Sequence, residues 1–185
     1  PLSAAELGGQ LDRALAAAQE LTMNSIIIDT KYRDAVLFTS DTLEAAPLEI
    51  DVTSYLADKA REMGFYVYAT YDVSDLAGDD GKYLRAANAD GRTLDSVREN
   101  IGSFAETYKL DGILLDGYEN PADGQSYAQY LENGGGVGYQ NYLRQVPSAL
   151  VSAAASAVRE RAPGTQVGLL ADAVWENAAE NPGGT

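Results

Sequence analysis

Gly112-Ile113-Leu114-Leu115-Asp116 is an uninterrupted apolar run that ends in an aspartate. Three other runs end in the same way: Ser25-Ile26-Ile27-Ile28-Asp29, Phe65 to Asp72, and Val167 to Asp172. Continuous runs of this length, rich in Ile, Val, Leu and Tyr, are typical of parallel strands buried on both faces. We therefore predict four parallel strands, each with an aspartate at its carboxyl end. In α/β folds, ligands bind at that edge of the sheet.

Helical patterns separate these runs. Ser3-Ala4-Ala5-Glu6 has the spacing of a capping box and precedes an Ala- and Leu-rich helix that extends to about residue 21. Further helices are predicted over about 53–63, 95–108 and 139–161. Pro147 is expected to break or kink the last of these near Gln145. The predicted order is therefore α-β-α-β-α-β-α-β within a single domain spanning residues 1–185.

Such alternation is typical of either a doubly wound sheet or part of a (β/α)8 barrel. A complete barrel needs eight strands and about 250 residues, which is more than this chain of 185 residues provides. The glycine-rich stretch Gly134–Gly138 has neither dinucleotide-binding nor P-loop spacing, so we interpret it as a flexible loop. No cofactor is expected.

Composition excludes several classes of function. Thirteen basic and 28 acidic residues give a formal charge of −15, which should repel nucleic acids and anionic lipids. The chain has no Cys and no His, which removes thiol nucleophiles, imidazole bases and the usual zinc ligands. Any chemistry must therefore use carboxylates, Tyr and Lys, and we expect no metal. The sequence shows neither an apolar stretch of about 20 residues that could cross a bilayer nor a signal peptide.

Residues Asp111-Gly112-Ile113-Leu114-Leu115-Asp116-Gly117-Tyr118-Glu119-Asn120-Pro121 resemble the DGIHxDDYxYP signature of the bacterial glycosyl-hydrolase-like family 10 proteins. Residues 23–40, 63–69 and 167–185 are similar to further segments of that family, in the same order. The resemblance implies a truncated (β/α)8 barrel that contains strands 2 to 5 of eight. It also implies activity on a polysaccharide or on peptidoglycan glycan, and a secreted or cell-envelope location in a bacterium. The chain departs from the family pattern at Leu114, Gly117, Asp29, Lys31 and Glu176.

Glycoside hydrolysis needs two carboxyl groups on either side of the scissile bond. Asp116 is the best candidate for the nucleophile or base, because it ends the central strand and matches the signature. Glu119 or Glu176 is the candidate acid, and Asp72 and Asp29 are further candidate partners. The candidate substrate-binding residues are Asp29, Lys31, Arg33, Tyr71, Tyr118, Asp172, Trp175 and Asn177, of which the three aromatic residues could form walls for a sugar ring.

Plainer interpretations remain open for the same residues. An aspartate at the end of a strand is often a helix N-cap or a turn former. Asp111, at the start of its strand, is expected to be a turn residue at the face opposite the site, and Lys31 or Arg33 could form structural ion pairs with Asp29 or Asp34. The alternative function is a non-catalytic carbohydrate-binding or structural module that kept the barrel and lost the chemistry.

An open four-stranded sheet leaves two unpaired edges and one exposed face. We expect the chain to cover that face by forming a homodimer or by folding the loop at 127–138 over it.

Overall fold

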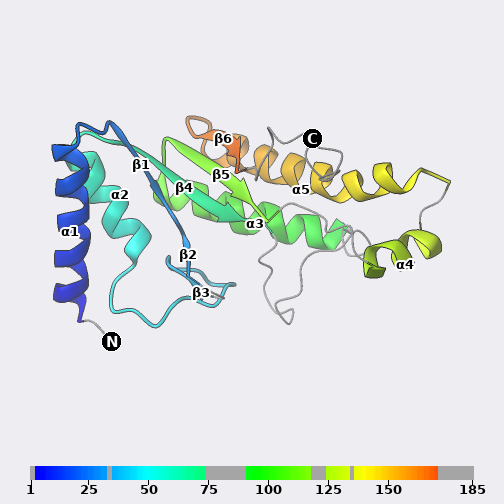
Figure 1. The fold of residues 1–185 in the computed structure, drawn as a ribbon, viewed down its shortest axis with the longest axis horizontal. Coiled ribbons are helices and arrows are strands. Elements are labelled where there is room, and N and C mark those ends of the chain that lie inside the picture. The colour runs from blue at the N-terminus through cyan, green and yellow to red at the C-terminus, as the bar shows by residue number, and fades with distance from the viewer. Residues whose placement is uncertain (1–2, 33–34, 74–90, 118–123, 134–135, 171–185) are drawn as a thin grey trace.

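The computed structural model describes residues 3–32, 35–73, 91–117, 124–133 and 136–170 (Figure 1). Its main feature is a four-stranded parallel sheet in the order β1-β4-β5-β6. The order of elements is α1 (Ala4–Glu20), β1 (Ser25–Ile28), β2 (Lys31–Tyr32), β3 (Ala35–Val36), α2 (Val52–Glu62), β4 (Tyr66–Asp72), α3 (Gly91–Tyr108), β5 (Gly112–Asp116), α4 (Gly124–Asn133), α5 (Tyr139–Arg161) and β6 (Gln166–Leu169). The four predicted strands, their parallel direction and their order along the sheet are confirmed.

The helices begin and end close to the predicted residues. The Ser3 hydroxyl accepts a hydrogen bond from the Glu6 N–H at 3.3 Å, and the Ser3 N–H donates to Glu6 Oε2 at 2.9 Å, so the capping box of α1 is confirmed. Helix α3 begins at Gly91, earlier than predicted. Helix α5 continues through Pro147, so of the predicted break or kink the break is wrong. Leu143 and Leu150, both buried, anchor the helix on either side of that proline.

In the part of the chain that the structure describes, helices cover one face of the sheet, which corrects the expectation of strands buried on both faces. Along β4 the side chains alternate between buried and partly exposed, with Val67 and Ala69 fully buried and Tyr66 59% exposed. Ile113 and Leu115 of β5 are also fully buried, on the face that carries the helices. An uninterrupted apolar run therefore occurs here on a sheet with one open face, as in an opened barrel.

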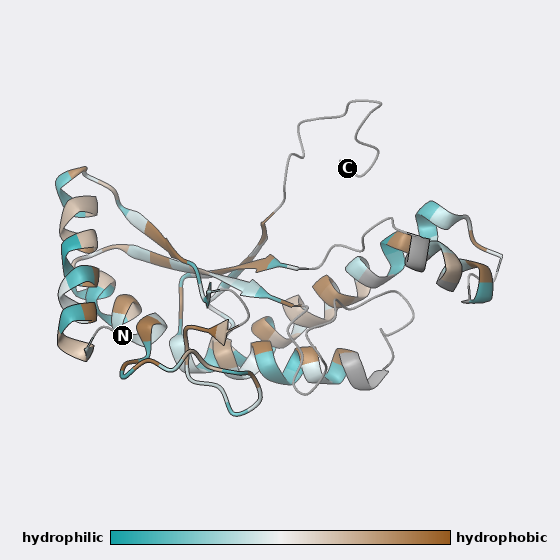
Figure 2. Cartoon of the chain, turned by 60° about the horizontal axis from the view of Figure 1, so that its bottom comes forward, coloured by the Kyte–Doolittle hydropathy of each residue, from teal (hydrophilic) through white to brown (hydrophobic). Residues whose placement is uncertain are grey.

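An aromatic cluster fills the core beneath this covered face. The rings of Phe38, Tyr71, Phe104 and Tyr108 lie 4.8–6.1 Å apart between their centroids. In the view of Figure 2, helical ribbon lies below the sheet, and brown, hydrophobic stretches run along the strands. The cluster joins the β3–α2 segment to β4 and α3, and so fixes the sheet edge at which β4 ends.

Three short elements, strands β2 and β3 and helix α4, were not expected. Strands β2 and β3 form an antiparallel pair directly after β1. Residues 124–133 form helix α4, and its Tyr127 and Tyr130 contact Tyr139 and Tyr142 of α5. The prediction that a loop at 127–138 covers the open face is therefore wrong, because most of that segment is helical and packs on α5 instead.

Candidate functional site

Side chains of the open face form rows that run across the strands. The register pairs Tyr68 with Gly112 and Thr70 with Leu114, and it pairs Asp72 with Asp116 in the last row. A Cβ atom on Gly112 would lie 2.6 Å from the Tyr68 ring, which confirms that these two residues project to the same side. Because side chains alternate along a strand, Asp72 and Asp116 also belong to this face. The open face therefore ends, at the carboxyl edge of the sheet, in two adjacent carboxylates.

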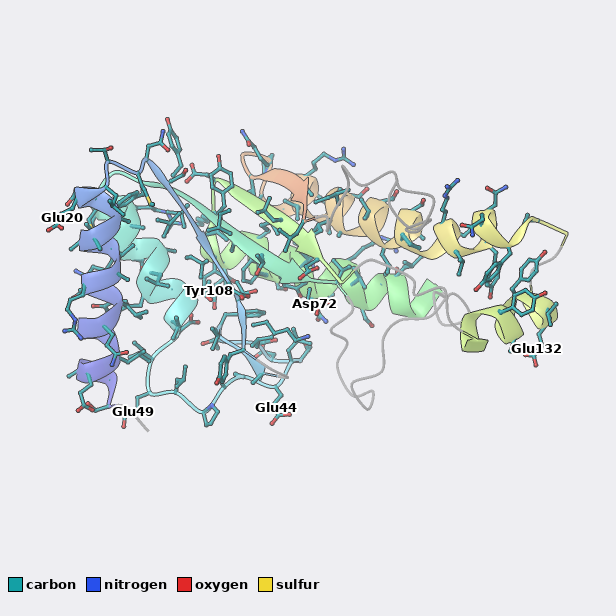
Figure 3. All side chains as sticks on the ribbon, viewed as in Figure 1. Glu20, Glu44, Glu49, Asp72, Tyr108 and Glu132 are labelled. Atoms are coloured by element: carbon teal, nitrogen blue, oxygen red, sulfur yellow. The ribbon has the colours of Figure 1, made fainter. Side chains whose placement is uncertain are left out.

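A lysine from the neighbouring segment reaches this row. Lys31, at the start of β2, places its Nζ atom 2.8 Å from Asp72 Oδ2 (Figure 3 labels Asp72). The side chains of Lys31 and Asp72 are 28% and 19% exposed, so the pair is only partly hydrated. Lys31 thus forms an ion pair, as the plainer interpretation allowed, and its partner among the described residues is Asp72. Asp34 lies outside the described residues. The ammonium group offsets the repulsion between the two carboxylates of the row.

Two threonine hydroxyls hold the end of β1 against β4. The Thr30 hydroxyl donates to the Thr70 carbonyl at 2.6 Å, and the Thr30 N–H donates to Thr70 Oγ1 at 3.2 Å. Thr70 Oγ1 in turn donates to Asp29 Oδ1 at 3.2 Å, and that oxygen also accepts from the Lys31 N–H at 3.2 Å. Asp29 is therefore tied to the backbone turn that presents Lys31. It is not a helix N-cap, because β2 follows it.

Asp116 is the exposed carboxylate of the row. Its Oδ1 atom accepts a hydrogen bond from the Gly117 N–H at 2.8 Å, and Gly117 has a φ of +65°. Asp116 thus helps to form the turn after β5, as the turn-former interpretation predicted. Its carbonyl accepts from the Val73 N–H at 3.0 Å, which extends the pairing of β4 with β5 past the row. Both aspartates are therefore carried by continuous strand pairing, which limits their relative movement.

The spacing of the two strands determines what these carboxylates can do. Neighbouring strands lie about 4.8 Å apart, so in-register side chains on one face are separated by about 5 Å. That separation is close to the 5–5.5 Å found between the two carboxyl groups of retaining glycosidases. The row of Lys31, Asp72 and Asp116 has charge and spacing suited to a sugar that carries developing positive charge.

Tyr71 does not form part of this site. Its side chain is 3% exposed, and its ring packs against Phe38 and Phe104 in the core. The expectation of an exposed aromatic wall at Tyr71 is corrected, because the residue lies on the helix-covered face, one position before Asp72. By contrast, the expected structural role of Asp111 is confirmed, because its Oδ2 atom accepts from the Val67 N–H at 2.7 Å at the opposite end of the sheet.

Seven of the predicted site residues fall outside the described part of the chain. They are Arg33, Tyr118, Glu119, Asp172, Trp175, Glu176 and Asn177. Among the residues that the structure describes, no group of three or more Asp, Glu, His or Cys side chains could hold a metal ion. No helix in the described ranges is both long enough and apolar enough to cross a membrane.

Two ionisable groups with perturbed pKa values, Asp51 and Tyr108, lie where α2 meets α3. Asp51 is the N-cap of α2, and its carboxylate accepts from the Ser54 N–H at 2.8 Å, the Thr39 N–H at 2.7 Å and the Tyr108 hydroxyl at 2.5 Å. Partial burial acts to raise the pKa of Asp51, but these hydrogen bonds outweigh it and lower that pKa below its usual value. Burial, followed by the bond to Asp51, raises the pKa of Tyr108. This network anchors α2 to α3, and no sequence motif indicated it.

No family model matches the chain, and no curated protein matches it. Solved structures of bacterial fucosidases do resemble it. A GH29 alpha-L-fucosidase from Bacteroides thetaiotaomicron superposes with a TM-score of 0.58 at 16% identity, over 85% of this chain and 33% of that one. A bacterial fucosidase with a monovalent iminocyclitol inhibitor gives 0.58 at 17% identity, over 90% and 38% of the two chains.

The alpha-L-fucosidase AlfC, in a fucosyltransferase variant, gives a TM-score of 0.54 at 14% identity, over 85% of this chain and 50% of that one. The chain thus spans about a third to a half of the length of these proteins. Identities this low establish the fold alone. The described structure therefore has the fold of part of a (β/α)8 barrel.

Proposed function

We propose that this chain is the glycan-cleaving part of a glycoside hydrolase barrel, with Asp116 as the reacting carboxylate. The observation that carries the proposal is the in-register pair of Asp72 and Asp116 at the carboxyl edge of two parallel strands. In barrel enzymes this edge carries the catalytic residues. The resemblance to the family 10 signature, which includes Asp116, supports the same choice.

The roles follow from the contacts of each carboxylate. Asp116 is exposed on the open face, so a sugar can approach it, and it acts as nucleophile or as the base that activates water. Asp72 is held by Lys31 at 2.8 Å and therefore supplies fixed negative charge beside the reacting carbon. The acid that protonates the leaving oxygen is Glu119 or Glu176. The substrate is a polysaccharide or the glycan of peptidoglycan, and the protein acts in a bacterial cell envelope or outside the cell.

A second candidate is a carbohydrate-binding module without catalysis. It is favoured by the fact that each described carboxylate of the site already has a partner: Asp29 has Thr70, Asp72 has Lys31, and Asp116 has the Gly117 amide. Such bonds stabilise the charged form of a carboxylate and so oppose its work as an acid or a base, while the remaining lone pairs can still accept hydrogen bonds from sugar hydroxyl groups.

The experiment is a turnover screen of this chain, and of any longer natural polypeptide that contains it. The probes are aryl glycosides, including alpha-L-fucosides, together with purified peptidoglycan and soluble polysaccharides. The hydrolase proposal expects release of product from at least one probe and loss of that activity in Asp116→Asn. Binding of an oligosaccharide at the row, seen by NMR shifts near Asp116, without turnover of any probe would reject the hydrolase and support the binding module.

A further inference from the structure

The described sheet has two edges at which further strands could pair. Strands β1 and β6 each pair on one side only within the described residues, and together with β4 and β5 they make up half of an eight-stranded barrel. The open face exposes large apolar side chains, since Ile27 is 61% exposed and Tyr66 59%. On the covered face, Leu169 at the β6 edge is 50% exposed. A sheet of this kind is stabilised by pairing its edges and covering that face.

A groove lies beside the β6 edge, on the covered face. Its volume is about 360 Å³, and the residues lining it include Val151, Ala155 and Arg159 of α5 and Val167 and Leu169 of β6. In right-handed β-α-β units each helix packs over the strand that follows it and the strand that precedes it. If a further strand paired with β6, the helix that leads into that strand would therefore lie in this groove.

Helix α1 has the properties of the element that fits this groove. It leads directly into the other edge strand, β1. Leu7, Leu11 and Ala18 lie on one of its faces and are only half-buried within the chain, and Leu21 at its end is 67% exposed. In the described residues, the α1–β1 unit thus has an apolar helix surface followed by a strand edge that can accept a partner. The α5–β6 unit has an apolar groove beside a strand edge of the same kind.

The charges of the two helices are complementary. Helix α1 carries Glu6, Asp12 and Glu20 against one basic residue, whereas α5 carries Arg144, Arg159 and Arg161 against one acidic residue. Both helices end next to the amino ends of their strands, so Glu20 at the end of α1 (Figure 3) and Arg159 near the end of α5 belong to the same end of a closed barrel. Both side chains are exposed.

We propose that two copies of this chain associate about a two-fold axis into an eight-stranded barrel. The β6 edge of each copy pairs with the β1 edge of the other, α1 of the partner fills the groove, and Arg159 faces Glu20 of the partner subunit. The arrangement buries Ile27 and Tyr66 of both copies in one barrel interior, and it covers Leu169 with α1 of the partner. The formal charge of −15 on each copy opposes association, so the interface forms best near 0.15 M salt, where the Debye length is about 8 Å.

The test is the molar mass of the 185-residue chain, measured by size-exclusion chromatography with light scattering and by sedimentation equilibrium in 0.15 M salt. The expected mass is twice the monomer mass of 19.7 kDa. Glu20→Arg and Arg159→Glu should each weaken the dimer about tenfold, because each change places two pairs of like charges across the interface. Combining both changes in one chain should restore most of the affinity.

Arg144→Glu is the matched control, because it alters net charge equally but lies 15 residues from Arg159 along α5, about 22 Å away. Ala155→Arg provides a second variant, since Ala155 is half-buried and lines the groove, so the longer side chain would fill it. Far-UV circular dichroism can verify the fold of this variant. A strict monomer at 0.1 mM would overturn the proposal and would leave the open face to further strands of a longer polypeptide. A dimer that is unaffected by the changes at Glu20, Arg159 and Ala155 would overturn it as well. Neither result depends on whether the chain cleaves glycans.

Discussion

The ion pair between Lys31 and Asp72 gives a stability prediction that is independent of catalysis. The double-mutant cycle uses Lys31→Met, Asp72→Asn and the chain with both changes. Exposed ion pairs contribute about 0–1 kcal/mol, and breaking a buried pair costs about 3–5 kcal/mol. The Lys31 and Asp72 side chains are 28% and 19% exposed, which places them between these limits. We therefore expect a coupling free energy of about 1–2 kcal/mol.

Lys31→Met alone should lower the free energy of unfolding by somewhat more than this coupling, because it removes the ammonium group that lies 2.8 Å from Asp72 in the row. The measurement is urea unfolding followed by circular dichroism at neutral pH. Lys59 and Glu62 provide the control cycle, since their side chains are 43% and 68% exposed and their atoms lie 3.2 Å apart. A coupling for Lys31 and Asp72 no larger than that of the control pair, or below about 0.3 kcal/mol, would refute the assignment of the pair to the site.

The remaining stability predictions concern Asp51 and Gly112. Hydrogen bonds lower the pKa of Asp51 in the folded state, so its contribution to stability is present above the unfolded pKa and is lost as the pH falls through the folded pKa. Asp51→Ala should therefore lower the free energy of unfolding by about 2 kcal/mol at pH 7 and by much less near pH 2. Urea unfolding at both pH values measures this difference. Gly112→Ala should cost about 1–3 kcal/mol, because the added Cβ would lie 2.6 Å from the Tyr68 ring and 3.3 Å from the Gln166 carbonyl oxygen. Gly9→Ala in α1 is the control, because its added Cβ would lie no closer than 3.7 Å to any other group, and it should raise the thermal midpoint. Equal losses of stability in the two glycine variants would contradict the close packing of Gly112 against Tyr68.

Much of the sheet could be predicted from the sequence because its strands are continuous apolar runs between clear helix signals. The run at Gly112–Asp116 agrees with β5 residue for residue. The same runs concealed which face is open, since Ile113, Leu114 and Leu115 are all apolar although only Leu114 lies on the open face. One-sided burial depends on which elements pack against each face of the sheet, and no local pattern reports it.

The candidate site could be predicted only in part. The aspartates were found because each ends a strand, which is a local signal. The partner of Lys31 depends on the offset between β1 and β4, and that offset appears only when the strands are paired. Thr30 and Thr70, which hold the turn, lie within the segments predicted as strand and loop and carry no motif. Helix α4 was missed because its ten residues are mostly polar and follow a region without an apolar period.

The central claim is that Asp116 is the reacting carboxylate of a glycoside hydrolase, and the most direct test is the value of kcat/KM for Asp116→Asn on the best probe of the screen. The change keeps size and hydrogen-bonding capacity, so Gly117 can still donate to the side-chain oxygen. We predict a loss of about a thousandfold or more, which corresponds to about 4 kcal/mol of transition-state stabilisation. Asp95→Asn, which removes an exposed carboxylate paired with Arg98 on α3, should retain wild-type activity. An Asp116→Asn enzyme within a few-fold of wild type would contradict the account and leave Asp116 with its turn-forming role alone.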